Sequence, residues 1–335
     1  MGLGSWGTAF ALVLADAGHH VRVWGRSPET VTLVNESRRN VRFHPDVELP
    51  PTITATTDAA SALESAGLVV LAVPAQSLRE NLTRWGASVP TEAVTLSLMK
   101  GLERGSGERM SEVVHEVTGR AAERIAVLSG PNLAREVVRR QPTASVIACV
   151  DPDVAEQVQA WTVTPYFRPY TNLDVVGVEL GGVVKNVIAL ATGMAEGMGF
   201  GDNSKAAIMT RGLAEMTRLG VAMKADPLTF MGLAGVGDLI ATCSSPLSRN
   251  RTFGENLGRG MTMDEVTAIT AQTAEGVTSC AAVLELAQQH GVDMPITEHV
   301  SGVVSQGWAP RDMVASLMSR VAKPEWHRGA RTDVG

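Results

Sequence analysis

Lys185 is the residue whose surroundings most clearly suggest chemistry. It is the only charged side chain between Leu180 and Ala195, in a stretch that is otherwise mainly apolar. Burying an ammonium group costs free energy unless it is paired with an anion or gives up its proton. A lysine in such a place can serve as a general acid or base. The alternative is a lysine at a domain edge whose charged end reaches solvent while its stem is buried.

A second group of polar residues lies in the segment GLAGVGDLIATCSSPLSRNR. Asp238 occupies a glycine-rich turn. Ser248, Arg249 and Asn250 then place a hydroxyl, a guanidinium and an amide in adjacent positions, which suits a phosphate ester. From spacing alone, a helix-capping turn is the alternative. Lys100 follows a predicted strand, at the end where doubly wound sheets bind ligands; otherwise it is a lysine in a surface turn.

The chain opens with MGLGSWGTAF, in which Gly2, Gly4 and Gly7 form the pattern G-x-G-x-x-G. Without a Cβ, such glycines allow a tight turn and bring backbone N–H groups close to an anion at a helix N-terminus. The pattern predicts a dinucleotide site, although a plain glycine-rich turn has the same sequence. Arg26 lies about 20 residues further on, where an acidic residue would bind the ribose of NAD. An arginine there can pair with a 2′-phosphate, so we expect NADP, with NAD also possible; the alternative is a solvated surface charge.

These residues must be positioned by two kinds of structure. In the first half, short apolar runs alternate with helical segments, which indicates a parallel, doubly wound α/β sheet of the Rossmann type. After residue 172 the strand signals stop and apolar residues recur at helical spacing, with Glu215 predicted on the side opposite one apolar stripe. We therefore expect a dinucleotide-binding domain over 1–172, an all-helical substrate and catalytic domain over 173–323, and a tail over 324–335.

The glycine turn lacks its usual leader strand. In a doubly wound sheet of order 3-2-1-4-5-6, the first strand is central and feeds this turn. Here only Met1 precedes Gly2, so the first strand of the predicted fold is largely missing. Unpaired backbone groups in the interior would cost about 1–3 kcal/mol each. We expect a destabilising gap or another segment recruited into it, and interpret Met1 as an internal residue of a natural strand that begins a few residues upstream.

The overall composition limits the class of protein. The 335 residues, 44% of them hydrophobic, suffice for two domains. A net charge of −6 with mixed signs disfavours nucleic acid and anionic membranes as partners. The three cysteines (Cys149, Cys243 and Cys280) are far apart, and the seven histidines form no cluster, so no metal is predicted. With no signal peptide and no apolar run of about 18 residues, we expect a soluble cytoplasmic protein.

Several segments together resemble the bacterial NAD(P)-dependent glycerol-3-phosphate dehydrogenases. They are GLGSWGTAFA, LMKGLE, LSGPNLAREV, VGVELGGVVKNVIALATGMAEGMGFGDNSKAAIMTRGLAEMTRLG, FMGLAGVGDLIATC, SRNRTFGENLGRG and DMPITEHV. The resemblance implies interconversion of dihydroxyacetone phosphate and sn-glycerol 3-phosphate by hydride transfer with NADPH or NADH. It also implies a supply of glycerol phosphate for phospholipid synthesis, and a homodimer.

The resemblance also implies roles for individual residues, with Lys185 as the general acid–base. The implied substrate site consists of Lys100, Gly130, Asn132, Lys185, Asp238, Ser248, Arg249 and Asn250. The implied cofactor site consists of Gly2, Gly4, Ser5, Trp6, Gly7, Arg26, Phe43, Lys100, Ala134, Arg249, Thr273 and Glu275. Three places depart from the family pattern: Asn132 replaces a serine or threonine, His44 a leucine, and Thr273–Ala274 two valines.

Two other classes of protein stay open. A related two-domain dehydrogenase acting on a β-hydroxyacid or hydroxyacyl thioester would share the architecture, but such enzymes lack the SRNR cluster. Activity without a substrate phosphate would favour that class. A non-catalytic NADPH-binding relative would need neither Lys185 nor Asp238, and NADPH binding without turnover would favour it.

Overall fold

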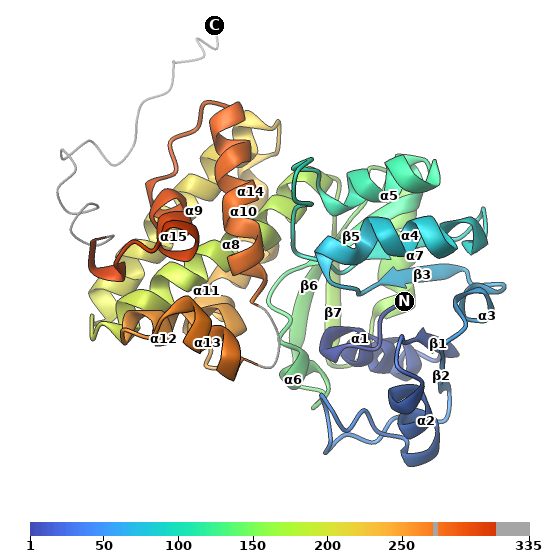
Figure 1. Ribbon diagram of the computed structural model, residues 1–335. Helices are drawn as coiled ribbons and strands as arrows, with labels where there is room; N and C mark the ends of the chain where they lie inside the picture. The colour runs from blue at the N-terminus through green and yellow to red at the C-terminus, as the bar shows by residue number, and fades with distance from the viewer. Residues whose placement is uncertain (271–273, 313–335) are drawn as a thin grey trace, which may run out of the picture.

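The computed structural model describes residues 1–270 and 274–312 of the chain. It consists of an α/β half and a helical half that lie side by side, on the right and left of Figure 1. The expected tail over 324–335 lies outside the described residues.

The α/β half alternates strands and helices as predicted. Its strands are β1 (Val21–Trp24), β2 (Ile53–Thr56), β3 (Leu68–Leu71), β4 (Val94–Ser97), β5 (Ile125–Ser129), β6 (Thr143–Ala148) and β7 (Phe167–Asn172). Its α-helices are α1 (Ser5–Asp16), α2 (Pro28–Ser37), α3 (Ala59–Leu63), α4 (Leu78–Trp85), α5 (Met110–Thr118), α6 (Ala134–Val137) and α7 (Pro152–Thr162). Every residue of β4 and β5 is buried, as in strands that are covered on both faces.

The strands form two sheets, β1-β2 and β3-β4-β5-β6-β7. Neighbouring strands are parallel except β5 and β6, which are antiparallel. The doubly wound sheet is confirmed, but the predicted parallel direction is wrong at this pair, because the connection holds only the four-residue α6 in place of a full crossover helix. β7, which the sequence did not predict, is an edge strand. Its sequence FRPYTN contains a proline, which the ladder tolerates at an edge.

The backbone of Met1 and Gly2 connects the two sheets. The Met1 amine donates to the Val70 carbonyl at 2.7 Å. The Ala72 amide donates to Met1 O at 2.9 Å, and the Gly2 amide donates to Trp24 O at 3.0 Å. Beside them a cavity of about 640 Å³ lies between β1 and β3. The described residues line this cavity without filling it, so the expected gap is present. No described segment of the chain has been recruited into it.

The helical half is built around one long central helix. Its helices are α8 (Val175–Gly197), α9 (Asp202–Ala222), α10 (Pro227–Met231), α11 (Asp238–Ser244), α12 (Arg249–Gly258), α13 (Met263–Ile269), α14 (Glu275–Gln289) and α15 (Pro295–Gln306), with a π-helical turn over Leu233–Gly237. α8 is long and apolar enough to cross a membrane, contrary to the sequence expectation that no such run exists. However, 94% of that apolar window is buried inside the protein, as in a core helix.

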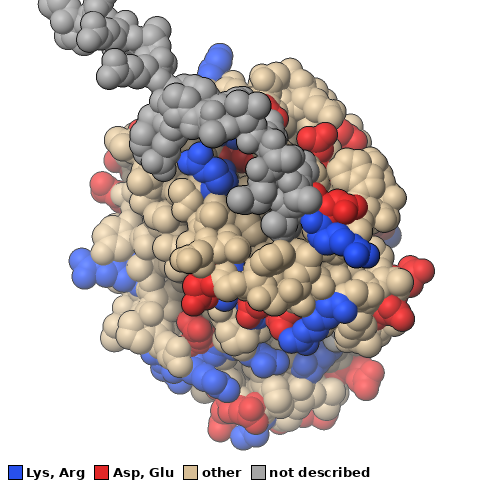
Figure 2. Space-filling model, turned by 90° about the vertical axis from the view of Figure 1, so that its left-hand side faces the viewer, with Lys and Arg blue, Asp and Glu red and all other residues tan. Residues whose placement is uncertain are grey.

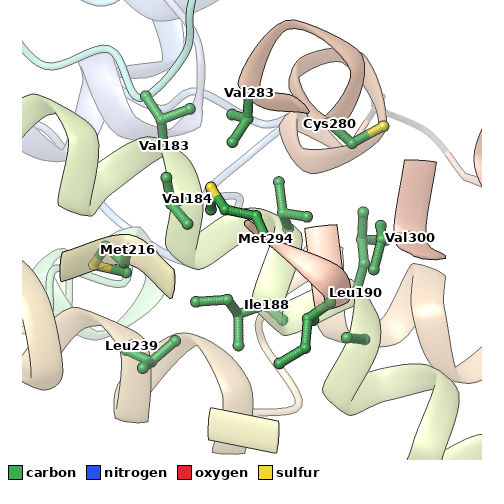
Figure 3. Packing of buried hydrophobic residues seen from close by; sticks show 14 of the residues in the cluster. Val183, Val184, Ile188, Leu190, Met216, Leu239, Cys280, Val283, Met294 and Val300 are labelled. Atoms are coloured by element: carbon green, nitrogen blue, oxygen red, sulfur yellow. The ribbon is translucent and has the colours of Figure 1, made fainter. Parts of the chain in front are cut away.

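Side chains from the other helices surround α8. Figure 3 shows Val184 and Ile188 of α8 among Met216, Leu239 and Val283, which come from α9, α11 and α14. On the outer face shown in Figure 2, Lys and Arg side chains are mixed with Asp and Glu side chains.

α8 and α12 approach each other backbone to backbone. A Cβ on Gly193 of α8 would lie 2.0 Å from Arg251 O, and one on Gly254 of α12 would lie 2.2 Å from Leu190 O. Only glycine permits this approach, which fixes the start of α12 beside the middle of α8.

Glu215 is buried, so its predicted position on the exposed side of α9 is wrong. Its carboxylate accepts hydrogen bonds from the amides of Ile296 and Thr297 at 2.7 and 3.2 Å. These amides open α15, and the first N–H groups of a helix need an acceptor from outside the helix. Burial raises the pKa of Glu215 to about 7.

Candidate active site

Lys185 and Asp238 form a buried ion pair in the helical half. Nζ of Lys185 lies 2.9 Å from Oδ1 of Asp238 and 2.7 Å from Oγ1 of Thr242. The two charged residues are only 6% and 2% exposed. The alternative of a lysine with a solvated end is therefore wrong. Partners among the described residues use two of its three Nζ protons, which leaves the third for a substrate oxygen.

Lys100 brings the α/β half to the same carboxylate. It lies just after β4, and its Nζ donates to Asp238 Oδ2 at 2.7 Å. The same Nζ donates to Gly130 O at 3.1 Å and to Asn132 Oδ1 at 3.0 Å. These three acceptors use all three Nζ protons, so Lys100 ties the segment after β5 to the helical half. Lys100 follows β4, as the sequence predicted, and its part in a ligand site stays a prediction.

The charges at this junction depend on one another. Burial alone would raise the pKa of Asp238, but the charges of Lys100 and Lys185 outweigh it and hold that pKa below its usual value. Burial, with the nearby charge of Lys185, lowers the pKa of Lys100 to about 8 despite Asp238. Burial also raises the pKa of Glu275, against the opposing charges of Arg249 and the two lysines. One carboxylate thus holds two lysines in place.

Thr242 was not identified from the sequence. It lies one helical turn after Asp238 in α11, and its hydroxyl lies 3.2 Å from Asp238 Oδ1. The i, i+4 spacing puts both side chains on one face of the helix, so a polar residue at that spacing was the available signal. Lys185, Asp238 and Thr242 form a closed hydrogen-bonded triangle.

The SRNR segment begins α12. Ser248 caps the helix, with its Oγ accepting from the Arg251 amide at 3.3 Å, so the capping alternative is confirmed for this residue. Asn250 is buried, donates to Asn186 Oδ1 at 2.9 Å, and accepts from the Gly276 amide at 2.9 Å. Arg249 is exposed at the first position of the helix. An exposed guanidinium at a helix N-terminus is suited to an anion.

The glycine turn has the geometry that its pattern predicts. A Cβ on Gly7 would lie 2.0 Å from Gly2 O, and Gly2 has a φ of +120°, so both positions require glycine. A Cβ on Gly4 would meet no protein atom within 4 Å. The first turn of α1 has no side-chain cap and no acidic residue. Its N–H groups therefore point toward open space, which fits the pyrophosphate of a dinucleotide.

The other predicted cofactor residues lie around this turn or across the site from it. Nε1 of Trp6 is buried without a hydrogen-bond partner among the described residues, and Ser5 Oγ lies 3.2 Å from Nε2 of His44. Arg26 is exposed just after β1, and the guanidinium of Arg42 lies 5.3 Å from the ring centre of Phe43. Ala134 and Glu275 begin α6 and α14, whereas Thr273 lies outside the described residues.

The α/β half has an uncapped helix N-terminus after a glycine turn, and Lys100 joins this half to a buried lysine–aspartate pair. Together these features are typical of a dinucleotide-dependent dehydrogenase. Comparisons with known proteins identify the family. The model for the N-terminus of NAD-dependent glycerol-3-phosphate dehydrogenase matches residues 1–155, and the model for its C-terminus matches residues 174–315. The chain belongs to this family.

Individual relatives agree along nearly the whole chain. A glycerol-3-phosphate dehydrogenase (NAD(P)+) from Streptomyces avermitilis is 61% identical over 97% of this chain and 96% of its own length. The corresponding protein from Thermobifida fusca is 59% identical over 97% of each chain. The crystal structure of glycerol-3-phosphate dehydrogenase from Coxiella burnetii superposes with a TM-score of 0.91 at 37% identity, covering 95% of this chain and 97% of that one.

Proposed function

We propose that this protein interconverts dihydroxyacetone phosphate and sn-glycerol 3-phosphate, with NADPH or NADH as the cofactor. The observation that carries the proposal is Lys185. Its ammonium is buried, held by Asp238 and Thr242, and keeps one proton free. The names of the relatives support the substrate and the cofactor.

Proton transfer belongs to Lys185 in this proposal. A dinucleotide held at the glycine turn would supply the hydride for ketone reduction and would take it up in the reverse reaction. During reduction, Nζ of Lys185 gives a proton to the ketone oxygen, and during oxidation it takes the proton of the hydroxyl. Asp238 and Thr242 hold Nζ in place. Lys100 has no spare proton and acts as a positioning residue for Asp238 and Asn132.

Arg249 is the proposed contact to the substrate phosphate, with help from Ser248 and Asn250. It is exposed at the N-terminus of α12, where its guanidinium can meet an anion. Gly130, Asn132, Lys100 and Asp238 complete the proposed substrate site. The proposed cofactor residues are those predicted from the sequence: Gly2, Gly4, Ser5, Trp6, Gly7, Arg26, Phe43, Lys100, Ala134, Arg249, Thr273 and Glu275.

Arg26 is the proposed determinant of NADP preference, since it is exposed where the adenosine ribose of a dinucleotide would lie. The boundary between a dinucleotide-binding domain (1–172) and a helical catalytic domain (173–323) is part of the proposal. So are a homodimer, a cytoplasmic location and a supply of glycerol phosphate for phospholipid synthesis.

Incubation of the purified protein with dihydroxyacetone phosphate and NADPH tests the proposal, with the product identified as sn-glycerol 3-phosphate. NADPH oxidation should require the phosphorylated ketone. If the protein binds NADPH but turns over neither dihydroxyacetone phosphate nor a β-hydroxyacid, the proposal is contradicted and a non-catalytic relative is favoured. Faster turnover of a β-hydroxyacid that lacks phosphate would favour the related dehydrogenase class.

A further inference from the structure

The segment that holds His44 is fixed against the glycine turn by Asn40. The side-chain amide of Asn40 donates to Leu3 O at 3.3 Å and to Thr8 Oγ1 at 2.8 Å, so it contacts both the glycine turn and α1. The backbone amide of His44 donates to Asn40 O at 2.8 Å. Asn40 and His44 are only 1% and 4% exposed. The His44 ring is therefore held beside the start of α1.

One ring nitrogen of His44 faces both oxygens of Ser5. Nε2 lies 2.9 Å from the Ser5 carbonyl oxygen and 3.2 Å from Ser5 Oγ. A carbonyl oxygen can only accept a hydrogen bond, so Nε2 carries a proton and donates it. The hydroxyl oxygen of Ser5 then accepts from the same N–H. The hydroxyl keeps its own proton for another acceptor, since Ser5 Oγ has no further partner among the described residues.

The ring of His44 is neutral near pH 7. Burial lowers the pKa of His44 below its usual value, and the positive charge of Arg135 acts in the same direction, although the hydrogen bond to Ser5 opposes both. A neutral imidazole has a single N–H, and the Ser5 carbonyl fixes it at Nε2. The Ser5 hydroxyl is therefore held with its oxygen toward the ring.

Ser5 stands where an anion would meet the open end of α1. It is the first residue of the helix, whose first turn has no side-chain cap. A Cβ on Gly4, the residue before it, would meet no protein atom within 4 Å. A phosphate at a helix N-terminus accepts hydrogen bonds from the first N–H groups. A hydroxyl with a free proton adds one more donor to that set.

We propose that His44 is a positioning residue for the cofactor: by donating to Ser5, it leaves the Ser5 hydroxyl proton for an oxygen of the pyrophosphate. The inference rests on the proposed cofactor site and adds a residue that acts through Ser5. NADPH and NADH have the same pyrophosphate, so the contribution of His44 should be equal for both cofactors. This separates His44 from Arg26, whose proposed contact is to the 2′-phosphate alone.

The test measures dissociation constants for NADPH and NADH by fluorescence titration without substrate. His44→Leu fills the buried position without an N–H and should weaken both cofactors by roughly fivefold, the equivalent of one hydrogen bond. His44→Gln places an amide N–H near the position of Nε2 and should stay within about twofold of the wild type. His290→Leu, at an exposed position at the end of α14, is the matched control and should bind like the wild type.

A double-mutant cycle separates positioning from a merely structural role. In a Ser5→Ala background the hydroxyl is absent, so His44→Leu should cause no further loss of affinity. Unchanged affinity of His44→Leu, or the same loss with and without the Ser5 hydroxyl, would overturn the proposal. Because binding is measured without turnover, a wild type that binds both cofactors but reduces no ketone contradicts the proposed function alone.

Discussion

Oδ1 of Asp238 lies 2.9 Å from Nζ of Lys185, although 53 residues separate them in the chain. The pair is buried, and its other carboxylate oxygen holds Lys100 from the opposite half of the molecule. A single carboxylate therefore fixes the proposed proton donor and ties it to the sheet.

Replacement of Lys185 by alanine is expected to lower kcat by on the order of 10²–10⁴, because the substrate oxygen loses its proton source. Fluorescence titration should show that NADPH still binds. Lys205→Ala, which removes a lysine paired with Asp202 on α9, is the matched control and should leave kcat unchanged. A Lys185→Ala variant with half of the wild-type kcat would remove this residue from the mechanism.

Asp238→Asn keeps the shape of the side chain and removes its charge. Two buried lysines would then face each other without a carboxylate, and breaking a buried pair costs about 3–5 kcal/mol. Chemical denaturation should show this loss, and kcat should fall at least tenfold because Nζ of Lys185 is no longer held. Asp264→Asn, at an exposed position in α13, is the control. An unchanged free energy of unfolding would show that the Asp238 carboxylate does not compensate the buried charges of Lys100 and Lys185.

Glu215 predicts a pH dependence of stability. Its pKa is about 7 in the folded protein against an ordinary value of 4.5, so the folded state binds the proton more tightly. The free energy of unfolding should therefore fall as pH rises from about 4.5 to about 7, by up to about 3 kcal/mol. Glu215→Gln should flatten this part of the profile, whereas Glu298→Gln, exposed on α15, should not. Parallel profiles for Glu215→Gln and the wild type would exclude this group as the cause.

Arg26→Asp should weaken NADPH binding much more than NADH binding, since the new carboxylate repels a 2′-phosphate. Dissociation constants for both cofactors measure the effect. Arg84→Asp, on the exposed side of α4, controls for the change in net charge. Equal weakening of both cofactors would make Arg26 a structural residue or a contact to the adenine alone.

The sequence predicted the alternation of strands and helices because buried strands and amphipathic helices leave distinct periodicities. It missed β7, whose polar, proline-containing sequence is stable only at a sheet edge. Glu215 was misplaced because the start of α15, about 80 residues away, supplies the donors that make its burial tolerable. The antiparallel β5–β6 pair depends on the path of a connection, which periodicity does not report.

For the candidate site, residue types were predictable and pairings were not. A lone lysine in an apolar helix must have a partner, but no local pattern identifies Asp238 as that partner. Lys100 was predicted at the end of a strand. That all three of its protons are used follows from the approach of the segment after β5 and of α11. That Thr242 completes the triangle follows from the packing of α8 against α11.

The most direct test of the proposed function compares kcat/KM for dihydroxyacetone phosphate with that for dihydroxyacetone, using NADPH. Each charge-assisted hydrogen bond to the phosphate contributes about 1.5–3 kcal/mol, so the phosphorylated ketone should be preferred by on the order of 10²-fold or more. Arg249→Ala should reduce this preference by raising KM for the phosphorylated ketone much more than KM for dihydroxyacetone. Comparable kcat/KM values for the two ketones in the wild type would contradict the account.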